Sequence, residues 1–195
     1  KELLQSRVAR MEESLREVGA ISRKEKNILK RKIAREKLHG EELQRLEEIR
    51  DQIMDWRKVI HVVMLPTAGE LAEVIEPAIS AVANSNFPNS QFIILLATEE
   101  RELEEKRLEK VNYLKNKFQG VFRDFIVTTH EVKGDEMKAK SSNATFAARR
   151  LAEYLKEKKI DFQRVIFSNF DCDSVAHPQY FAALTYEYCI DPKRL

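Results

Sequence analysis

Asp171 and Asp173, one residue apart, directly follow the apolar run at residues 165–170. Carboxylate oxygens suit hard divalent cations, and Mg²⁺ and Mn²⁺ commonly share their coordination shell with phosphates. If the run is a strand of an open parallel sheet, the pair lies beyond its carboxyl end, where such sheets bind ligands. The spacing therefore predicts that Asp171 and Asp173 hold Mn²⁺ or Mg²⁺. The alternative is a solvated loop, because Asp-x-Asp also occurs by chance at protein surfaces.

Further polar residues collect at the carboxyl ends of the other predicted strands and at the start of the helix before the fourth. In chain order they are Pro66, Thr67, Glu70, Glu99, Glu100, Arg101, Lys140 and Asn143. Together with Asp171 they would line one rim of the sheet, which suits a nucleoside diphosphate with its metal. Simpler interpretations exist for two of these places. Residues 99–101 could begin a charged surface helix, since acidic residues are favoured in a first turn, and Lys140 could be solvated.

Other chemical signatures are missing from the sequence. No Gly-x-Gly-x-x-Gly and no Gly-x-x-x-x-Gly-Lys-Ser/Thr is present, so neither standard glycine-rich phosphate loop applies. The four histidines are scattered, and no Ser-His-Asp or Cys-His set has a suitable spacing. Cys172 and Cys189 have no metal-type spacing, so reduced thiols in a cytosolic setting are expected.

Strands and helices that alternate along the chain must position these residues. Short apolar, β-branched runs predict strands at 59–65, 92–97, 125–128 and 165–170. Helical spacing of apolar residues predicts helices at 73–84, 99–118, 143–158 and 178–188, with Pro77 in a first turn. This alternation implies parallel pairing through right-handed crossovers. The predicted fold class is α/β: an open, mostly parallel, Rossmann-like sheet with helices on both faces, over residues 58–195.

Residues 1–57 contain no strand signal and predict a separate all-α segment, a helical hairpin or a three-helix arrangement. The second helix would begin at Arg23 and end at Gly40, which can adopt the left-handed conformation that terminates helices. A third helix would then carry the apolar residues from Leu43 to Trp56. Residues 23–37 are strongly basic, which indicates a solvated face or, as the alternative, attraction to anionic lipid headgroups.

The overall composition sets limits on function. Of 195 residues, 43% are apolar and 34% charged, which is typical of a globular chain. The formal net charge of +2 is too small to indicate a nucleic-acid partner. No apolar run approaches the roughly 18 residues of a membrane span. Only about one helix follows the Asp pair, so we interpret the sequence as a fragment, incomplete at its C-terminus.

From Asp55 to the last residue, the chain resembles the family 2 glycosyltransferases, and more closely a membrane-associated branch of them. The resemblance rests on the order and spacing of five segments: residues 61–67 (HVVMLPT), 85–88 (SNFP), 95–101 (LLATEER), 140–143 (KSSN) and 170–181 (FDCDSVAHPQYF). It implies a glycosyltransferase A-type fold that binds a UDP- or GDP-linked sugar with Mn²⁺ or Mg²⁺. It also implies a saccharide or lipid acceptor, and a place at the cytoplasmic face of a membrane through segments absent here.

The resemblance also implies roles for individual residues. Asp173 would be the main metal ligand, and Asp171 would contact the ribose or a metal-bound water. The residues that would border the base and ribose are Thr67, Glu70, Glu99, Glu100 and Arg101, while Lys140 and Asn143 match the family's Lys and Asn after the third strand. Two departures concern specificity: Ala68 stands where an aromatic residue is expected, and residues 139–143 read AKSSN in place of GKGSN.

The base that activates the acceptor is expected beyond Leu195, so the fragment should bind donor more readily than it turns over. Two other functions fit parts of the sequence. A phosphatase with an Asp nucleophile would need more of its catalytic domain after the first strand than a single helix. A non-catalytic helical interaction module fused to a degenerate nucleotide-binding domain is the alternative from another class. Metal-dependent nucleotide binding would separate it from the enzyme.

Overall fold

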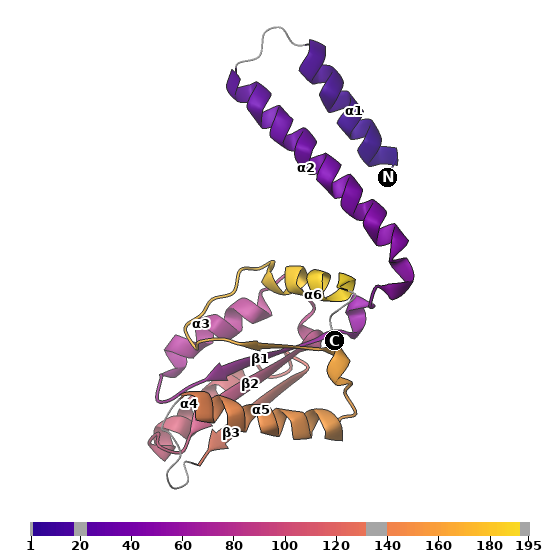
Figure 1. The fold of residues 1–195 in the computed structure, drawn as a ribbon. Coiled ribbons are helices and arrows are strands. Elements are labelled where there is room, and N and C mark those ends of the chain that lie inside the picture. Colours follow the sequence, from indigo (N-terminus) through magenta and orange to yellow (C-terminus); the bar gives the residue numbers. More distant parts are fainter. Residues whose placement is uncertain (1, 18–22, 132–139, 192–195) are drawn as a thin grey trace. The chain divides into compact units, whose positions relative to one another are not determined.

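The computed structural model describes residues 2–17, 23–131 and 140–191 (Figure 1). Its contacts divide the chain into two compact units, one that contains residues 1–53 and one that contains residues 54–189. We call the second the α/β unit. Among the described residues, no helix combines the length and the apolar character needed to cross a bilayer.

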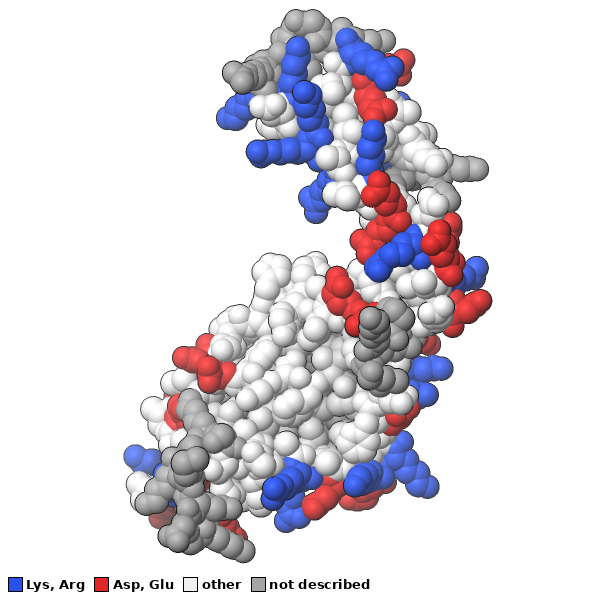
Figure 2. All heavy atoms as spheres, viewed as in Figure 1, with Lys and Arg blue, Asp and Glu red and all other residues white. Residues whose placement is uncertain are grey.

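The first unit is a helical hairpin of α1 (Glu2–Glu17) and α2 (Arg23–Glu48). Ion pairs between the helices join Arg7 with Glu36 at 2.8 Å and Lys37 with Glu12 at 2.7 Å. Basic side chains dominate the half of α2 that begins at Arg23, and acidic ones are more frequent toward Glu48 (Figure 2). Such largely exposed ion pairs typically contribute about 0–1 kcal/mol each to stability.

The predicted helix end at Gly40 is wrong, and so is the third helix. Gly40 lies inside α2, which continues to Glu48 and is followed only by a 3-10 turn at Arg50–Gln52. A glycine costs a helix interior roughly 1 kcal/mol relative to alanine, which flanking helix formers can offset. Glycine therefore permits a helix end without requiring one.

The α/β unit is built on a sheet of four strands. They are β1 (Ile60–Pro66), β2 (Phe92–Glu99), β3 (Asp124–His130) and β4 (Val165–Asn169). Their order is β3-β2-β1-β4 and all three pairings are parallel. Val63 in β1 is paired with Ile94 on one side and Ser168 on the other. The predicted parallel α/β fold is confirmed.

Helices cover both faces of this sheet (Figure 1). One face packs against α3 (Ala72–Ala83), α4 (Glu104–Lys117) and α6 (Tyr180–Ile190), and the other against α5 (Lys140–Glu157). The chain moves one way from β1 to β3 and then reverses to reach β4. Crossovers of constant handedness must change face at that reversal, which explains why α5 lies opposite α3 and α4.

The two central strands hold the core. Every residue of β1 and β2 is buried, as expected for parallel strands covered on both faces. Several helix boundaries differ from the sequence prediction by one to five residues, among them the starts of α4 and α3. Helix α4 begins at Glu104 rather than at residue 99, and α3 begins at Ala72, so Pro77 lies within the helix. Short 3-10 helices complete the unit at Trp56–Lys58, Asn89–Gln91 and Phe162–Arg164.

Candidate functional site

The strand order places a topological switch point between β1 and β4. From β1 the chain leads to β2 on one side, while β4 lies on the other. In sheets of this kind, ligands bind in the crevice outside the carboxyl ends of the strands at the switch point. Thr67 directly follows β1, and Asp171 comes two residues after the end of β4. The amide of Phe170 still donates to the Met64 carbonyl at 2.9 Å, so the pairing extends almost to Asp171.

Asp171 and Asp173 are both exposed, whereas Cys172 between them is 4% exposed and belongs to the core. The Ser174 amide donates to the Asp171 carbonyl at 2.9 Å and closes a turn. The buried thiol anchors the turn in the core, while the side chains of both its neighbours remain exposed. The turn, which Cys172 holds against the core, therefore presents two carboxylates to solvent.

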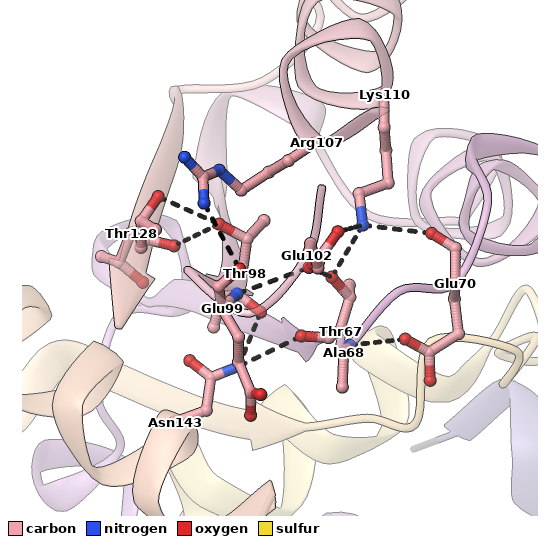
Figure 3. A network of polar contacts seen from close by, with 12 residues as sticks. Thr67, Ala68, Glu70, Thr98, Glu99, Glu102, Arg107, Lys110, Thr128 and Asn143 are labelled. Atoms are coloured by element: carbon pink, nitrogen blue, oxygen red, sulfur yellow. Dashed lines mark hydrogen bonds and ion pairs between the residues drawn. The ribbon is translucent and has the colours of Figure 1, made fainter. Parts of the chain in front are cut away.

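At the end of β1, Thr67 joins a buried polar network (Figure 3). Its side-chain hydroxyl donates to Glu102 Oε1 at 3.2 Å and accepts a hydrogen bond from Lys110 Nζ at 3.1 Å. Lys110 and Glu102 form an ion pair in which each side chain is 5% exposed. Three segments, the end of β1, the β2–α4 loop and α4, are thus joined through charged groups that water scarcely reaches.

The loop from Thr67 to Glu70 is held at its far end as well. Lys110 Nζ donates to the Glu70 carbonyl at 3.1 Å, and the Glu70 carboxylate accepts from the Ala68 amide at 2.6 Å. Gly69 between them has φ of +119°, a conformation that favours glycine. Glu70 therefore orders the loop locally, whereas Lys110 ties it to α4.

Asn143 connects the ends of β1 and β2 from the opposite face of the sheet (Figure 3). Its side-chain amide donates to the carbonyls of Ala97 at 2.9 Å and Thr67 at 3.3 Å. The residue is 1% exposed, and its Oδ1 has no hydrogen-bond partner among the described residues. Asn143 thus holds two strand ends together and keeps an acceptor available beside them.

The segment at the end of β2 divides into buried and exposed positions. Glu99 is 2% exposed, and both Nε and Nη2 of Arg101 donate to its carboxylate. The side chain of Glu100 is exposed, and its amide donates to the His130 carbonyl at 3.0 Å. Of the three residues predicted here, Glu99 and Arg101 form a pair and Glu100 points to solvent.

The structure brings together only some of the predicted site residues. Thr67, Glu70, Glu99 and Asn143 share the network of Figure 3, while Pro66 is buried in β1 opposite Ala97. Lys140 is the first residue of α5, and its side chain lies outside the described residues. The two residues that sequence reasoning missed are Glu102 and Lys110, the ion pair at the centre of the network.

A cavity of about 380 Å³ lies beside this network. The loop after β1 and the first turns of α4 line it, with Glu102 and Lys110 among its residues. The loop conformation thus shapes one wall of this cavity.

The candidate metal ligands have a donor set that fits a hard cation only in part. No group of three or more His, Cys, Asp or Glu side chains that could hold a metal occurs within the described ranges. Asp171 and Asp173 supply two hard oxygen sites. Mg²⁺ and Mn²⁺ are typically bound by one or two carboxylates plus substrate phosphates and water. The pair therefore fits such an ion when a diphosphate completes its shell.

Comparison with known proteins gives little further information. No family model matches the sequence, and no curated protein matches it. Among solved structures, the crystal structure of S. aureus TarS is similar over 67% of this chain and 20% of that chain, with 15% sequence identity and a TM-score of 0.42. At this identity and TM-score, the match assigns no function.

Proposed function

We propose that the α/β unit binds a nucleoside-diphosphate sugar with Mn²⁺ or Mg²⁺, as the donor-binding part of a glycosyltransferase. The observation that carries the proposal is the exposed Asp171–Asp173 turn after β4, next to the end of β1 at the switch point. Ligands bind at this place in open parallel sheets. The five sequence segments that resemble family 2 glycosyltransferases include the end of β1, the end of β2, the start of α5 and this turn.

In this proposal the described residues divide into two groups. Asp173 and Asp171 hold the cation, which would neutralise charge that develops on the leaving diphosphate. Thr67, Glu70 and Glu99 lie around the ends of β1 and β2, where the base and ribose would bind. The available Oδ1 of Asn143 suits an N–H or O–H donor of the ligand, because a buried acceptor gains from being satisfied.

The partners follow from the same chemistry. The donor would be UDP- or GDP-linked, the acceptor a saccharide or lipid, and the place of action the cytoplasmic face of a membrane. These points are supported by the resemblance of the sequence segments alone. We assign no residue of this chain as the base that deprotonates the acceptor, a role worth about 10²–10⁴ in rate.

Calorimetric titration tests the proposal directly. UDP and GDP are titrated into the protein with Mn²⁺, with Mg²⁺ and with EDTA. We expect binding of at least one nucleotide to weaken at least about tenfold in EDTA, the lower end of what disturbing a metal site costs. Equal affinity in EDTA would contradict a metal role and favour the alternative of a non-catalytic module.

A matched pair of variants locates the metal. Asp173→Asn replaces a charged ligand by a neutral amide and should remove most of the metal-dependent affinity. Asp161→Asn makes the same chemical change at another exposed aspartate, which caps a 3-10 helix by accepting from the Gln163 amide at 3.0 Å. Asn caps as well as Asp, so this control should bind like the wild type.

A further inference from the structure

Lys110 is the buried charge that the proposed chemistry leaves without a role. It lies on α4, its side chain is 5% exposed, and it reaches the loop after β1 rather than solvent. A lysine is almost never buried in this way without partners, because the ammonium group loses its hydration. Its contacts therefore indicate what it does.

All three ammonium hydrogens of Lys110 have acceptors, two at the ends of the loop 67–70 and one in the loop before α4. They are the Thr67 hydroxyl at 3.1 Å, the Glu70 carbonyl at 3.1 Å and the Glu102 carboxylate at 2.5 Å. Glu102 in turn accepts from the Thr67 hydroxyl and, at 3.4 Å, from the Glu99 amide. Lys110, Thr67 and Glu102 thus form a closed ring of hydrogen bonds, and Lys110 adds the bond to Glu70 at the other end of the loop 67–70 (Figure 3).

Apolar packing does not hold this loop. Ala68 and Gly69 are exposed, and a Cβ atom added to Gly69 would meet nothing within 4 Å. The conformation at Gly69 is also one of several open to glycine. The backbone between Thr67 and Glu70 is thus fixed by polar contacts. One lies inside the loop, from the Ala68 amide to the Glu70 carboxylate, and Lys110 contacts both ends.

A buried ion pair is a poor means of raising stability alone. Two apolar residues of similar volume often stabilise a protein as well or better, because no charges need to be removed from water. Directional hydrogen bonds, in contrast, select one geometry of the groups that they join. The arrangement around Lys110 therefore suits control of the loop conformation.

We propose that Lys110, with Glu102, is a positioning residue that fixes the loop 67–70 in the conformation that receives a nucleotide. It acts through Thr67 and Glu70 and does not touch the ligand. That the ligand is a nucleotide rests on the proposed function. The order of the loop 67–70, in contrast, can be measured without any ligand.

The decisive variant is Lys110→Met together with Glu102→Leu, which removes both charges and keeps a filled interior. Its matched control is Lys117→Met with Glu76→Leu, a more exposed ion pair at 2.6 Å that joins the same helix to α3. Three quantities are compared with the wild type: the thermal unfolding midpoint, hydrogen exchange of the amides at 68–71 without ligand, and UDP affinity with Mn²⁺.

We expect the Lys110/Glu102 variant to stay folded, with loop exchange faster by about tenfold or more and nucleotide affinity weaker by about tenfold. The control pair should change neither the loop exchange nor the nucleotide affinity. Unchanged loop exchange in a folded variant overturns the proposal. If the wild type binds no nucleotide, the proposed function fails, and loop exchange alone still decides the positioning role. Should the double variant fail to fold, Glu102→Gln, which keeps the oxygen but loses the charge, is judged by the same exchange measurement.

Discussion

The imidazole of His61 and the hydroxyl of Thr185 lie 2.6 Å apart, from Nε2 to Oγ1, at the contact between β1 and α6. His61 is 0% exposed and Thr185 2%. Rings of Phe87, Phe92 and Phe181 surround the imidazole at centroid distances of 4.9–5.5 Å. A polar pair inside an aromatic cluster thus connects β1 to α6, the helix that follows the Asp turn.

Protonation of His61 should destabilise the fold. Burial lowers the pKa of His61 from 6.5 to about 4. Between these values the unfolded chain binds the proton and the folded chain does not, so stability is full above pH 6.5 and falls as pH drops toward 4. The slope from this group is at most about 1.4 kcal/mol per pH unit. Urea unfolding at several pH values measures it.

Carboxylates also titrate in this range, so a variant is needed to isolate the histidine. His61→Phe with Thr185→Val removes both partners of the hydrogen bond and keeps an apolar interior. The free energy of unfolding of this double variant should depend less on pH between 4 and 6.5 than that of the wild type. Parallel curves for the two proteins would show that His61 is not buried in its neutral form.

Asn143→Ala should destabilise the α/β unit by about 1–2 kcal/mol. The substitution removes the donor to the Thr67 carbonyl and one of two donors to the Ala97 carbonyl, and leaving a buried acceptor unsatisfied costs about 1–3 kcal/mol. Asn116→Ala, at an exposed position of α4, is the control and should change stability by under about 0.5 kcal/mol. Equal changes in the free energy of unfolding for the two substitutions, measured with urea, would contradict the role of Asn143 in joining the ends of β1 and β2.

Asp173→Asn should leave the free energy of unfolding within about 0.5 kcal/mol of the wild type in EDTA. The side chain is exposed, and the turn is closed by backbone atoms of Asp171 and Ser174. Thermal unfolding in EDTA checks this. A loss of several degrees would mean that the carboxylate supports the fold, and loss of metal binding in this variant would then be no evidence for coordination.

Both cysteines should be unreactive in the folded protein. Cys172 and Cys189 are each 4% exposed and form no disulfide. Because a thiol reagent must reach the sulfur, modification should require local or global opening. Titration with a chromogenic disulfide reagent should show slow reaction in buffer and two thiols in denaturant. Rapid reaction of the Cys172 thiol, read in a Cys189→Ser variant, would place it outside the core and remove the anchor of the Asp turn.

The sheet could be predicted from the sequence because its central strands are continuous apolar runs. Residues 60–66 and 92–99 are fully buried, and only such runs tolerate covering on both faces. The order of the strands, in contrast, could not be predicted, since β4 could have joined either edge of the sheet. Its place beside β1 does not follow from the sequence pattern, because the same alternation of strands and helices fits either edge.

The helical segment shows where a local signal failed. Gly40 has the residue type of a helix terminator, but glycine only makes a left-handed residue inexpensive and does not impose it. The residues on both sides are good helix formers, and the helix continued. Whether a helix ends at a glycine depends on whether contacts of the following residues outweigh continuation of the helix. The sequence pattern does not reveal such contacts.

Part of the candidate site could be predicted because strand ends meet at one edge of a parallel sheet. Thr67 was predicted in this way and Asn143 from its place at the start of the helix before β4, whereas Lys110 was hidden among the charged residues of α4. One signal was present: Lys110 lies one helical turn before buried Leu114, on the same inward face. A lysine at an inward position predicts a buried acidic partner, and Glu102 is that partner.

The order β3-β2-β1-β4 also bears on how the protein assembles. Met64 is paired with Leu95 nearby in the chain, but with Asn169 at a separation of roughly 100 residues. At synthesis rates of about 5–20 residues per second, β4 leaves the ribosome roughly 5–20 s after β1. The rim at the ends of β1 and β2 can therefore exist before the Asp turn joins it. A cation bound there would stabilise the finished chain and could not guide the first stages of its folding.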